Sequence, residues 1–304
     1  MKRFTIGTDP EFFLKEKETG KLVSAIPYIN GTKHEPEALP SGGTIQRDNV
    51  AVEFATAPAV SMDDFIKKIR ETFKDVLKVI PDNFDLVATP SAVFDDDQLE
   101  HPDALTFGCD PDYNAWTISE NSENNKPSHP NKNFRSCGGH IHVGHVSGDG
   151  NDFLLDPFGK INMVRGMDLV HGIVSVILDS SIESIERRKL YGSAGCHRPT
   201  DYGVEYRVLS NYWLKSPFLV MLMDSLTQDV LKLIKENKLN QLINFVGEQE
   251  IQSIINNGDV ANANSIFNKA IKSCLSADSI FYFEESLKRV ENINLKKEWG
   301  LEEV

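Results

Sequence analysis

The sequence predicts a mixed α/β fold in which helices are concentrated toward the carboxyl end. From Phe4 to about Leu209, short β-rich runs alternate with loops of Gly, Pro, Asp and Asn. Beyond this region Leu and Ile recur at helical spacing, and the chain is predicted to be almost wholly helical in stretches at 217–235, 240–256, 262–273 and 277–291. A chain of 304 residues can form one large domain or two small ones with a sizeable core.

Composition and charge exclude several classes of partner. The chain is 40% hydrophobic and 25% charged, as is ordinary for a globular protein, and its formal net charge is −13. This charge argues against a main role in binding nucleic acid, and no apolar run approaches the roughly 20 residues that span a bilayer. We therefore expect neither a nucleic acid nor a membrane partner.

The amino terminus and the cysteines indicate the compartment. The first residues carry a basic pair with no apolar signal core behind it, and the four cysteines are widely separated without CxxC spacing. These features favour neither export nor a disulfide framework, so we expect a reducing, cytoplasmic setting.

The elements of the amino-terminal part follow from local patterns. Ser61 before Met62-Asp63-Asp64 is a good helix start, and apolar residues continue at helical spacing to Ile80, where Pro81 follows. A second helix, apolar on a broad face, is predicted to run through the core at 161–182. Strands are predicted at Phe4–Ile6, Phe12–Leu14, Val50–Ala55, Phe84–Thr89 and Val204–Leu209.

A glycine-flanked histidine pair is the most informative motif. Residues 137–144 read Cys-Gly-Gly-His-Ile-His-Val-Gly, and on an extended strand His140 and His142 share one face. Gly138 and Gly139 let the backbone bend just before that strand. The pair indicates a metal or phosphate site, and the alternative is a half-exposed strand with surface histidines.

Paired acids occur in two other strand-like segments. Asp9 and Glu11 are two residues apart, so on an extended backbone both carboxylates face one side and suit a hard cation such as Mg²⁺. The alternative is a turn at Asp9-Pro10 that ends a strand. Glu53 has apolar neighbours and is costly to bury unless a metal ion pairs with its charge, or else it faces solvent. Asp48 is its nearest acidic candidate partner.

Arginines gather in a fourth segment. Glu205 and Arg207 share one face of a predicted strand, and the loop before it is glycine-bearing but lacks the spacing of a P-loop. Guanidinium groups suit phosphate and carboxylate oxygens, although a surface salt-bridge ladder is the alternative. The arginines concerned are Arg187, Arg188, Arg198 and Arg207.

Together these groups have the chemistry of a site for phosphoryl transfer. Acids and histidines would bind divalent ions, and the ions would bind a nucleoside triphosphate. Arginines would neutralise the transferring phosphoryl group. At these residues the chain resembles the carboxylate-amine ligases of the glutamine synthetase and glutamate–cysteine ligase superfamily, most of all the phage-type amidoligases grouped as COOH-NH2 ligases. The motifs that carry the resemblance span roughly residues 4–215 and do not cover the helical tail. They are Gly7–Glu11, Glu53–Pro58, Cys137–Gly144 and Tyr202–Arg207.

The resemblance implies an α+β fold, with a curved antiparallel sheet whose concave face forms the active site and whose convex face is covered by helices. It implies ATP and Mg²⁺ (or Mn²⁺), and a carboxylate that is activated as an acyl phosphate and attacked by an amine. Both substrates would be small molecules or peptides. We expect a catalytic core at 1–215 and a helical region at 216–304 packed on it, in the host cytoplasm if the chain comes from a phage.

The resemblance also assigns roles to residues. Its implied metal ligands are Asp9, Glu11, Glu53, His140 and Glu205. Its implied nucleotide or cofactor contacts are His142, Arg188 and Arg198. Its implied catalytic residues are Arg207, Arg198 and Glu53. One departure is Asp9, which stands where relatives often have Glu.

Two other functions remain open on the sequence. One is a metal-dependent hydrolase that uses His140 and His142 with acids to activate water. The other is a non-catalytic module that binds a nucleotide or a peptide. Release of ADP that requires both an amine and a carboxylate would separate the ligase from both. We also expect the segments Asp95–Pro130 and Tyr191–Pro199 to close over ATP and exclude water.

Overall fold

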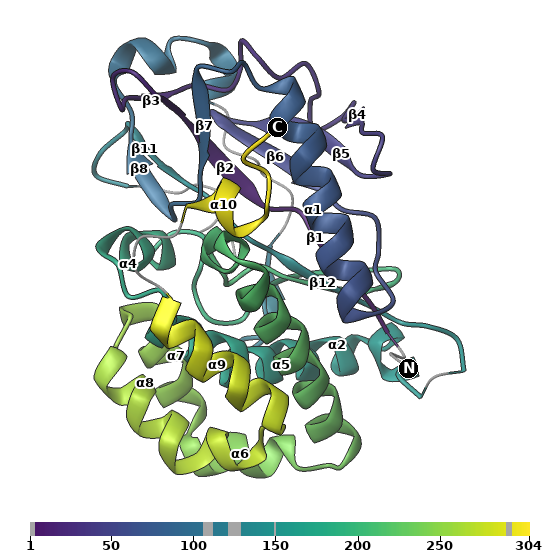
Figure 1. Ribbon diagram of the computed structural model, residues 1–304. Coiled ribbons are helices and arrows are strands. Elements are labelled where there is room, and N and C mark those ends of the chain that lie inside the picture. The colour runs from purple at the N-terminus through teal and green to yellow at the C-terminus, as the bar shows by residue number, and fades with distance from the viewer. Residues whose placement is uncertain (1–3, 106–111, 121–128, 149, 290–293) are drawn as a thin grey trace.

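A computed structural model describes residues 4–105, 112–120, 129–148, 150–289 and 294–304. Figure 1 shows the strands of the amino-terminal part and α1 (Met62–Val79) in the upper half and helices α5 to α9 in the lower half, with β1 and β12 between them. The α+β class is therefore confirmed at the level of a mixed fold with a curled antiparallel sheet.

Two larger sheets supply the framework, and all their strand pairs are antiparallel. The first has the order β1 (Thr5–Thr8), β12 (Ile141–Gly144), β14 (Gly203–Tyr206), β13 (Cys196–Thr200), β9 (Tyr113–Asn114) and β10 (Ser119–Glu120). The second has the order β3 (Leu22–Val23), β2 (Glu11–Glu16), β6 (Ala51–Ala55), β5 (Thr44–Asp48) and β4 (Glu37–Ala38), with β7 (Phe84–Val87) also paired to β2. A small ribbon pairs β8 (Ser91–Val93) with β11 (Phe134–Ser136).

Helix α1 packs against the second sheet. Its start is as predicted, because the Ser61 side chain caps it by accepting a hydrogen bond from the Asp64 N–H. Its Phe73 contacts both Phe12 of β2 and Phe54 of β6 at ring-centroid distances of 5.3 and 5.0 Å. These aromatic contacts fix the strands that carry Glu11 and Glu53.

The first sheet is backed by a long helical run. It comprises α2 (Pro157–Met167), a π-helical turn at Asp168–Gly172, and α3 (Ile173–Leu178). The prediction of a helix to residue 182 is wrong at its end, because Asp179 leaves the helical conformation and Ser181 caps a new helix, α4 (Ile182–Arg188). By length and composition the run 157–178 could cross a membrane, but 78% of its apolar window is buried inside the protein, as in a core helix.

The carboxyl-terminal region is helical as predicted. Helix α5 (Pro217–Lys235) has the expected bounds, whereas the stretch at 240–256 is divided into α6 (Leu239–Val246) and α7 (Glu248–Asn257). Gly247 has φ 99° at the break, a conformation that favours glycine. The remaining helices are α8 (Val260–Ile266), α9 (Ala277–Arg289) and α10 (Leu295–Glu298), with 3₁₀ or π turns at Asp96–Leu99, Pro102–Leu105, Asp152–Leu155, Asn211–Lys215, Phe267–Ile271 and Lys272–Cys274.

The end of the chain returns to the amino-terminal part. In Figure 1 the carboxyl terminus lies beside α1, and Arg70 of that helix donates a hydrogen bond to the Trp299 carbonyl. The Trp299 ring contacts Phe73, and its indole N–H donates to the Leu214 carbonyl. The division at residues 215 and 216 stays a prediction.

Candidate active site

The pleat of two central strands separates the site from the core. On β12, Ile141 and Val143 are buried in the hydrophobic core, so His142 points to the opposite face, as the sequence pattern predicts. On β14, Tyr206 points to the helical layer, where its hydroxyl donates to Asp168, and Glu205 points to the same face as His142. The histidine pair and Glu205 thereby share one face of the sheet.

Strand register forms a row of functional residues across the first sheet. Gly7 of β1 pairs with His142, His142 pairs with Glu205, and Glu205 pairs with Arg198 of β13. A second row lies in the other sheet, where Glu11 of β2 pairs with Glu53 of β6 and Glu53 with Gln46 of β5. The chain passes from one row to the other through Asp9 and Pro10, so the two sets of acids converge.

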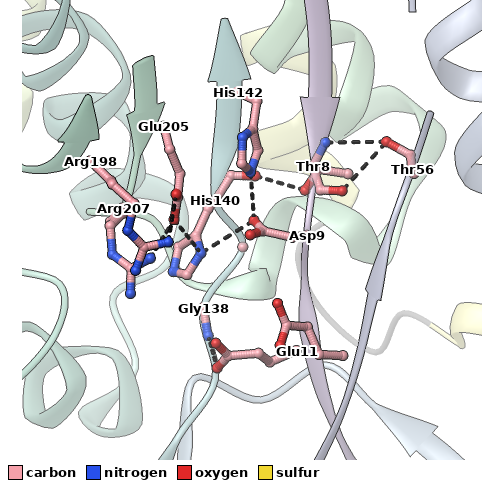
Figure 2. A network of polar contacts seen from close by, with 12 residues as sticks. Thr8, Asp9, Glu11, Thr56, Gly138, His140, His142, Arg198, Glu205 and Arg207 are labelled. Atoms are coloured by element: carbon pink, nitrogen blue, oxygen red, sulfur yellow. Dashed lines mark hydrogen bonds and ion pairs between the residues drawn. The ribbon is translucent and has the colours of Figure 1, made fainter. Parts of the chain in front are cut away.

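The first set is here called the histidine cluster and consists of Asp9, His140, His142 and Glu205 (Figure 2). Asp9 Oδ1 lies 3.0 Å from His142 Nε2 and 3.3 Å from His140 Nδ1, and His140 Nδ1 lies 3.4 Å from Glu205 Oε1. Within the described residues, neither Asp9 Oδ1 nor His140 Nδ1 has a contact of hydrogen-bond geometry, although both atoms are buried.

Two arginines hold Glu205 (Figure 2). Arg198 donates through Nη1 to Glu205 Oε2 at 2.9 Å, and Arg207 donates through Nη1 to Glu205 Oε1. Arg207 Nε also lies 3.8 Å from Asp112 Oδ1, at the start of the β9 strand. Glu205 is 2% exposed, so this pairing takes place away from solvent and orients both guanidinium groups.

The second set is here called the acidic cluster and consists of Glu11, Asp48 and Glu53. Glu11 accepts a hydrogen bond from the Gly138 N–H at 2.8 Å, which ties β2 to the glycine pair before β12. Glu53 accepts from the Gln46 amide at 2.6 Å. Asp48, the predicted partner of Glu53, influences the ionisation of both Glu11 and Glu53 and so belongs to the same cluster.

Charge compensation lowers the pKa of the acids in the histidine cluster. Burial by itself raises the pKa of Asp9, but His142 and His140 outweigh burial and hold it well below its ordinary value. Burial and the Asp9 charge likewise raise the pKa of Glu205, but Arg207 and the two histidines bring the net shift downward. Burial lowers the pKa of His140, whereas the Asp9 carboxylate outweighs burial at His142 and raises its pKa.

The acidic cluster shows the opposite shifts. Burial, followed by the charge of Asp48, raises the pKa of Glu11 to about 8. Burial and the charges of Asp48, Asp9 and Glu11 raise the pKa of Glu53 well above its ordinary value, and burial raises that of Asp48. Nearby cations, Arg187 and Arg207 at Glu11 and Lys33 at Asp48, offset burial only in part, so this cluster has the charge distribution of a site for a divalent ion.

A cavity of about 330 Å³ opens beside the acidic cluster. We call it the arginine cavity, because Arg135, Arg187, Arg207 and Lys132 lie on its wall together with Glu11, Asp48 and His140. Its size is in the range that holds a small organic ligand. Cationic groups that can bind phosphate oxygens and acids that can bind a divalent cation therefore line the same cavity.

Most of the candidate site residues predicted from the sequence lie in or beside the two clusters, but Arg188 does not. The Arg188 guanidinium is buried among the helices and donates to the Ser175 hydroxyl. Arg187 is the one that reaches the cavity wall, where it also donates to the Val208 carbonyl at 2.8 Å. At the end of a helix, adjacent arginines point in different directions, and the sequence alone does not choose between them.

Two contacts of the site were given no role in the sequence prediction. Asp112 pairs with Arg207, and it lies in the stretch 95–130, which was predicted to close over ATP without a role for Asp112 itself. Tyr202 lies inside a quoted motif, and its hydroxyl is 2.5 Å from His142 Nδ1. Of the predicted closing segments, residues 106–111 and 121–128 lie outside the described residues, and Tyr191 lines the arginine cavity.

Comparison with known families identifies the class. The family model of the phage phiEco32-like COOH.NH2 ligases, type 2, matches residues 118–302. The chain belongs to this family, which supports carbon–nitrogen ligase activity. The match contains His140, His142, Arg198, Glu205 and Arg207, and it includes the helical region that the sequence motifs do not cover. It begins after the motifs Gly7–Glu11 and Glu53–Pro58.

Other comparisons add little. A bifunctional glutathione synthetase from Pasteurella multocida resembles the chain with a TM-score of 0.42 and 10% sequence identity, over 96% of this chain and 53% of that chain. The chain thus spans about half the length of that protein, and a likeness of this extent carries no mechanistic argument. No curated protein matches the sequence significantly.

Proposed function

We propose that the protein is an ATP-dependent ligase that joins a carboxylate to an amine through an acyl phosphate. The observation that supports this proposal most is the convergence of the acidic cluster, the histidine cluster and paired arginines on one cavity. Family membership supplies the reaction class, and the residues around the cavity supply the groups that phosphoryl transfer needs. The cytoplasm, which supplies ATP, is the proposed setting.

Divalent cations, Mg²⁺ or Mn²⁺, fit the residues present. The proposed ligands are Asp9, Glu11, Glu53, His140 and Glu205, and we propose Asp48 as a further one because its charge acts on Glu53. Ligand atoms of Asp9, His142 and Glu205 also lie within 4.8 Å of one another, so His142 is a further candidate ligand. Bound there, the cations would neutralise the acids and the phosphate oxygens of ATP.

Arg207 and Arg198 are the proposed catalytic arginines. Glu205 holds both guanidinium groups, and Arg207 lines the arginine cavity, so little side-chain entropy remains to be lost when they bind an anion. Burial lowers the pKa of Arg207, but Glu205 and Asp112 outweigh burial and raise it, so its charge persists at every working pH. We assign these groups to the transferring phosphoryl group and the substrate carboxylate.

The proposed reaction has two steps. A carboxylate oxygen attacks the γ-phosphorus of ATP, the bond to the β-phosphate oxygen breaks, and ADP leaves. The amine then attacks the acyl carbon, the carbon–oxygen bond to phosphate breaks, and phosphate leaves while the nitrogen gives up a proton. Tyr191, which belongs to a segment expected to close over ATP, lines the cavity and is proposed to help exclude water from the acyl phosphate.

A screen of carboxylate and amine pairs for ADP release tests the proposal. We expect ADP only when ATP, a divalent cation, a carboxylate and an amine are all present, and hydroxylamine should trap the acyl phosphate when the amine is left out. ADP release that needs neither organic substrate would indicate a nucleotide hydrolase. Saturable ATP binding without any turnover would indicate a non-catalytic module.

A further inference from the structure

A second cavity lies on the opposite side of Asp9. It has a volume of about 360 Å³, and we call it the Gly7 cavity. Gly7, Gly144, Ala55 and Pro58 contribute much of its wall, and Asp9, His142 and Tyr202 contribute its ionisable groups. This volume is sufficient for a small ligand.

The two cavities meet at the histidine cluster. His140 lines the arginine cavity, Asp9 lines the Gly7 cavity, and the two side chains are 3.3 Å apart. This polar contact joins a residue that lines one cavity to a residue that lines the other (Figure 2). An enzyme that condenses two molecules needs two such spaces that share the position of the reacting atoms.

Strand register explains why the second cavity exists. Gly7 occupies the position next to His142 in the row across the first sheet and contributes no side chain there. A Cβ built on Gly7 would make ordinary van der Waals contacts at 3.8 Å with His142 Cβ and Thr56 Oγ1 and would not clash. Hydrogen bonds hold the backbone of this wall in place: the Thr8 hydroxyl donates to the His140 carbonyl, and the Thr56 N–H donates to the Thr8 carbonyl.

The charges of the two cavities are complementary to different substrates. Arginines and a lysine line the arginine cavity, so phosphates and carboxylates are favoured there. In the Gly7 cavity, no Lys or Arg is among the described residues of the wall, and Asp9 offers a carboxylate that accepts hydrogen bonds. Arg198, which lies near Tyr202, is bonded to Glu205. An amine, which donates hydrogen bonds, fits this environment. A carboxylate would compete for donors that are already engaged, because His142 Nε2 lies 3.0 Å from Asp9 Oδ1 and His142 Nδ1 lies 2.5 Å from the Tyr202 hydroxyl.

We propose that the Gly7 cavity binds the acceptor amine, and that this amine belongs to a molecule without a carboxylate beside the nitrogen, such as an alkyl amine or the amino terminus of a peptide. The proposal rests on the ligase function and names its second substrate class. A metal ion near Asp9 is compatible with it, because a nearby positive charge favours the neutral amine, and only the neutral form attacks an acyl carbon.

Direct binding of glycinamide and glycine tests the proposal, since the two differ only in the group beside the amine-bearing carbon. Titrations followed by NMR would use the whole protein, with and without Mg²⁺ and a non-hydrolysable ATP analogue. We expect glycinamide to bind at least about tenfold more tightly than glycine, because the described wall of the cavity holds no Lys or Arg and its His142 is already paired with Asp9. Equal or tighter binding of glycine, in either condition, or no saturable binding of glycinamide, would overturn the proposal.

Variants locate the binding. Gly7→Val fills the cavity and should weaken glycinamide binding at least about tenfold, whereas Ser119→Val on β10, at the opposite edge of the same sheet, should leave it unchanged. Gly7→Ala, whose added Cβ makes ordinary contacts, serves as the second variant if Gly7→Val does not fold. Unchanged binding in the folded Gly7 variants would place the amine elsewhere.

The outcome is separable from that of the ligase proposal. If glycinamide binds in the Gly7 cavity but no carboxylate yields ADP, the cavity assignment stands and the ligase function fails. If ADP forms with a free amino acid as the preferred amine, and Gly7→Val leaves the KM for that amine unchanged, the ligase function stands and the cavity assignment is wrong.

Discussion

The histidine cluster and the acidic cluster lie side by side and differ in how their charges are balanced. In the histidine cluster, arginines and imidazoles surround Asp9 and Glu205, and the pKa values of both carboxyls fall. In the acidic cluster, Glu11, Asp48 and Glu53 are buried near one another, and their pKa values rise. The protein itself balances the charges in one half of the site, and under the proposed function a bound cation would balance those in the other half.

This difference predicts opposite consequences of mutation. Removing a charge from the acidic cluster should relieve repulsion in the metal-free protein, and removing one from the histidine cluster should leave a buried partner uncompensated. Activity should suffer in both cases, so stability distinguishes the two halves.

The largest effect is expected for Glu53→Gln. We expect ATP turnover to fall on the order of 10³-fold, because a ligand for the cation is lost, while the metal-free melting temperature stays level or rises by a few degrees. Added Mg²⁺ should stabilise the variant less than it stabilises the wild type. Glu37→Gln on β4, at an exposed position, is the matched control and should change neither property. A metal-free variant that unfolds would make Glu53 a structural partner.

A somewhat smaller effect is expected for Arg207→Lys. Lysine keeps the charge but loses the planar fork that holds Glu205 and reaches toward Asp112, so kcat/KM should fall about 10²-fold. Steady-state ADP release measures this fall. Arg70→Lys, which alters a guanidinium bonded to Trp299 and Gly300, should leave kcat/KM unchanged. Wild-type kinetics in Arg207→Lys would assign Arg207 to a structural ion pair.

The same substitution should have different effects at the adjacent residues Arg187 and Arg188. Arg187→Lys should raise the KM for ATP about tenfold. Arg187 lines the arginine cavity, and a lysine cannot make the paired hydrogen bonds that a planar guanidinium makes to phosphate oxygens. Arg188→Lys should lower thermal stability with little change in that KM, since Arg188 contacts Ser175 among the helices. The reverse pattern would restore Arg188 to the nucleotide site.

The smallest effect on activity is expected behind the sheet, at Asp168. Burial raises the pKa of this carboxyl to about 7 despite hydrogen bonds from Trp116 and Tyr206. The folded protein therefore keeps a proton that the unfolded chain releases above pH 4, so Asp168 contributes a fall in stability between about pH 4 and 7, of up to about 1.4 kcal/mol per pH unit, in addition to the fall from the acidic cluster. Asp168→Asn should lack this contribution, so its denaturant titrations should show a shallower fall than those of the wild type. Parallel pH profiles for both proteins would contradict the assignment.

Local patterns were sufficient to predict much of the fold. The cap at Ser61, the strand around Glu53 and helix α5 follow from residues near them in the chain. The end of the helix at Leu178 was not predicted, because Asp179 is held by the Ser184 and Ser210 hydroxyls, and Ser210 is distant in sequence. Tertiary contacts of this kind override local periodicity.

The candidate site was predicted where period-two alternation decides side-chain direction, as at His140, His142 and Glu205. Its other members depend on register between strands far apart in the chain. The pairing of Glu11 with Glu53 and the proximity of Asp112 to Arg207 have no signal in either local segment. The choice of Arg187 over its neighbour depends on how the end of α4 packs.

Anomalous diffraction from crystals grown with Mn²⁺ and a non-hydrolysable ATP analogue would test the central claim most directly. The account predicts at least one peak within about 2.0–2.6 Å of carboxylate oxygens of Glu11 and Glu53. The arginine cavity beside it should hold the phosphates, and the peak should be absent in Glu53→Gln. Strong peaks away from both clusters, with nucleotide bound outside the arginine cavity, would contradict the account.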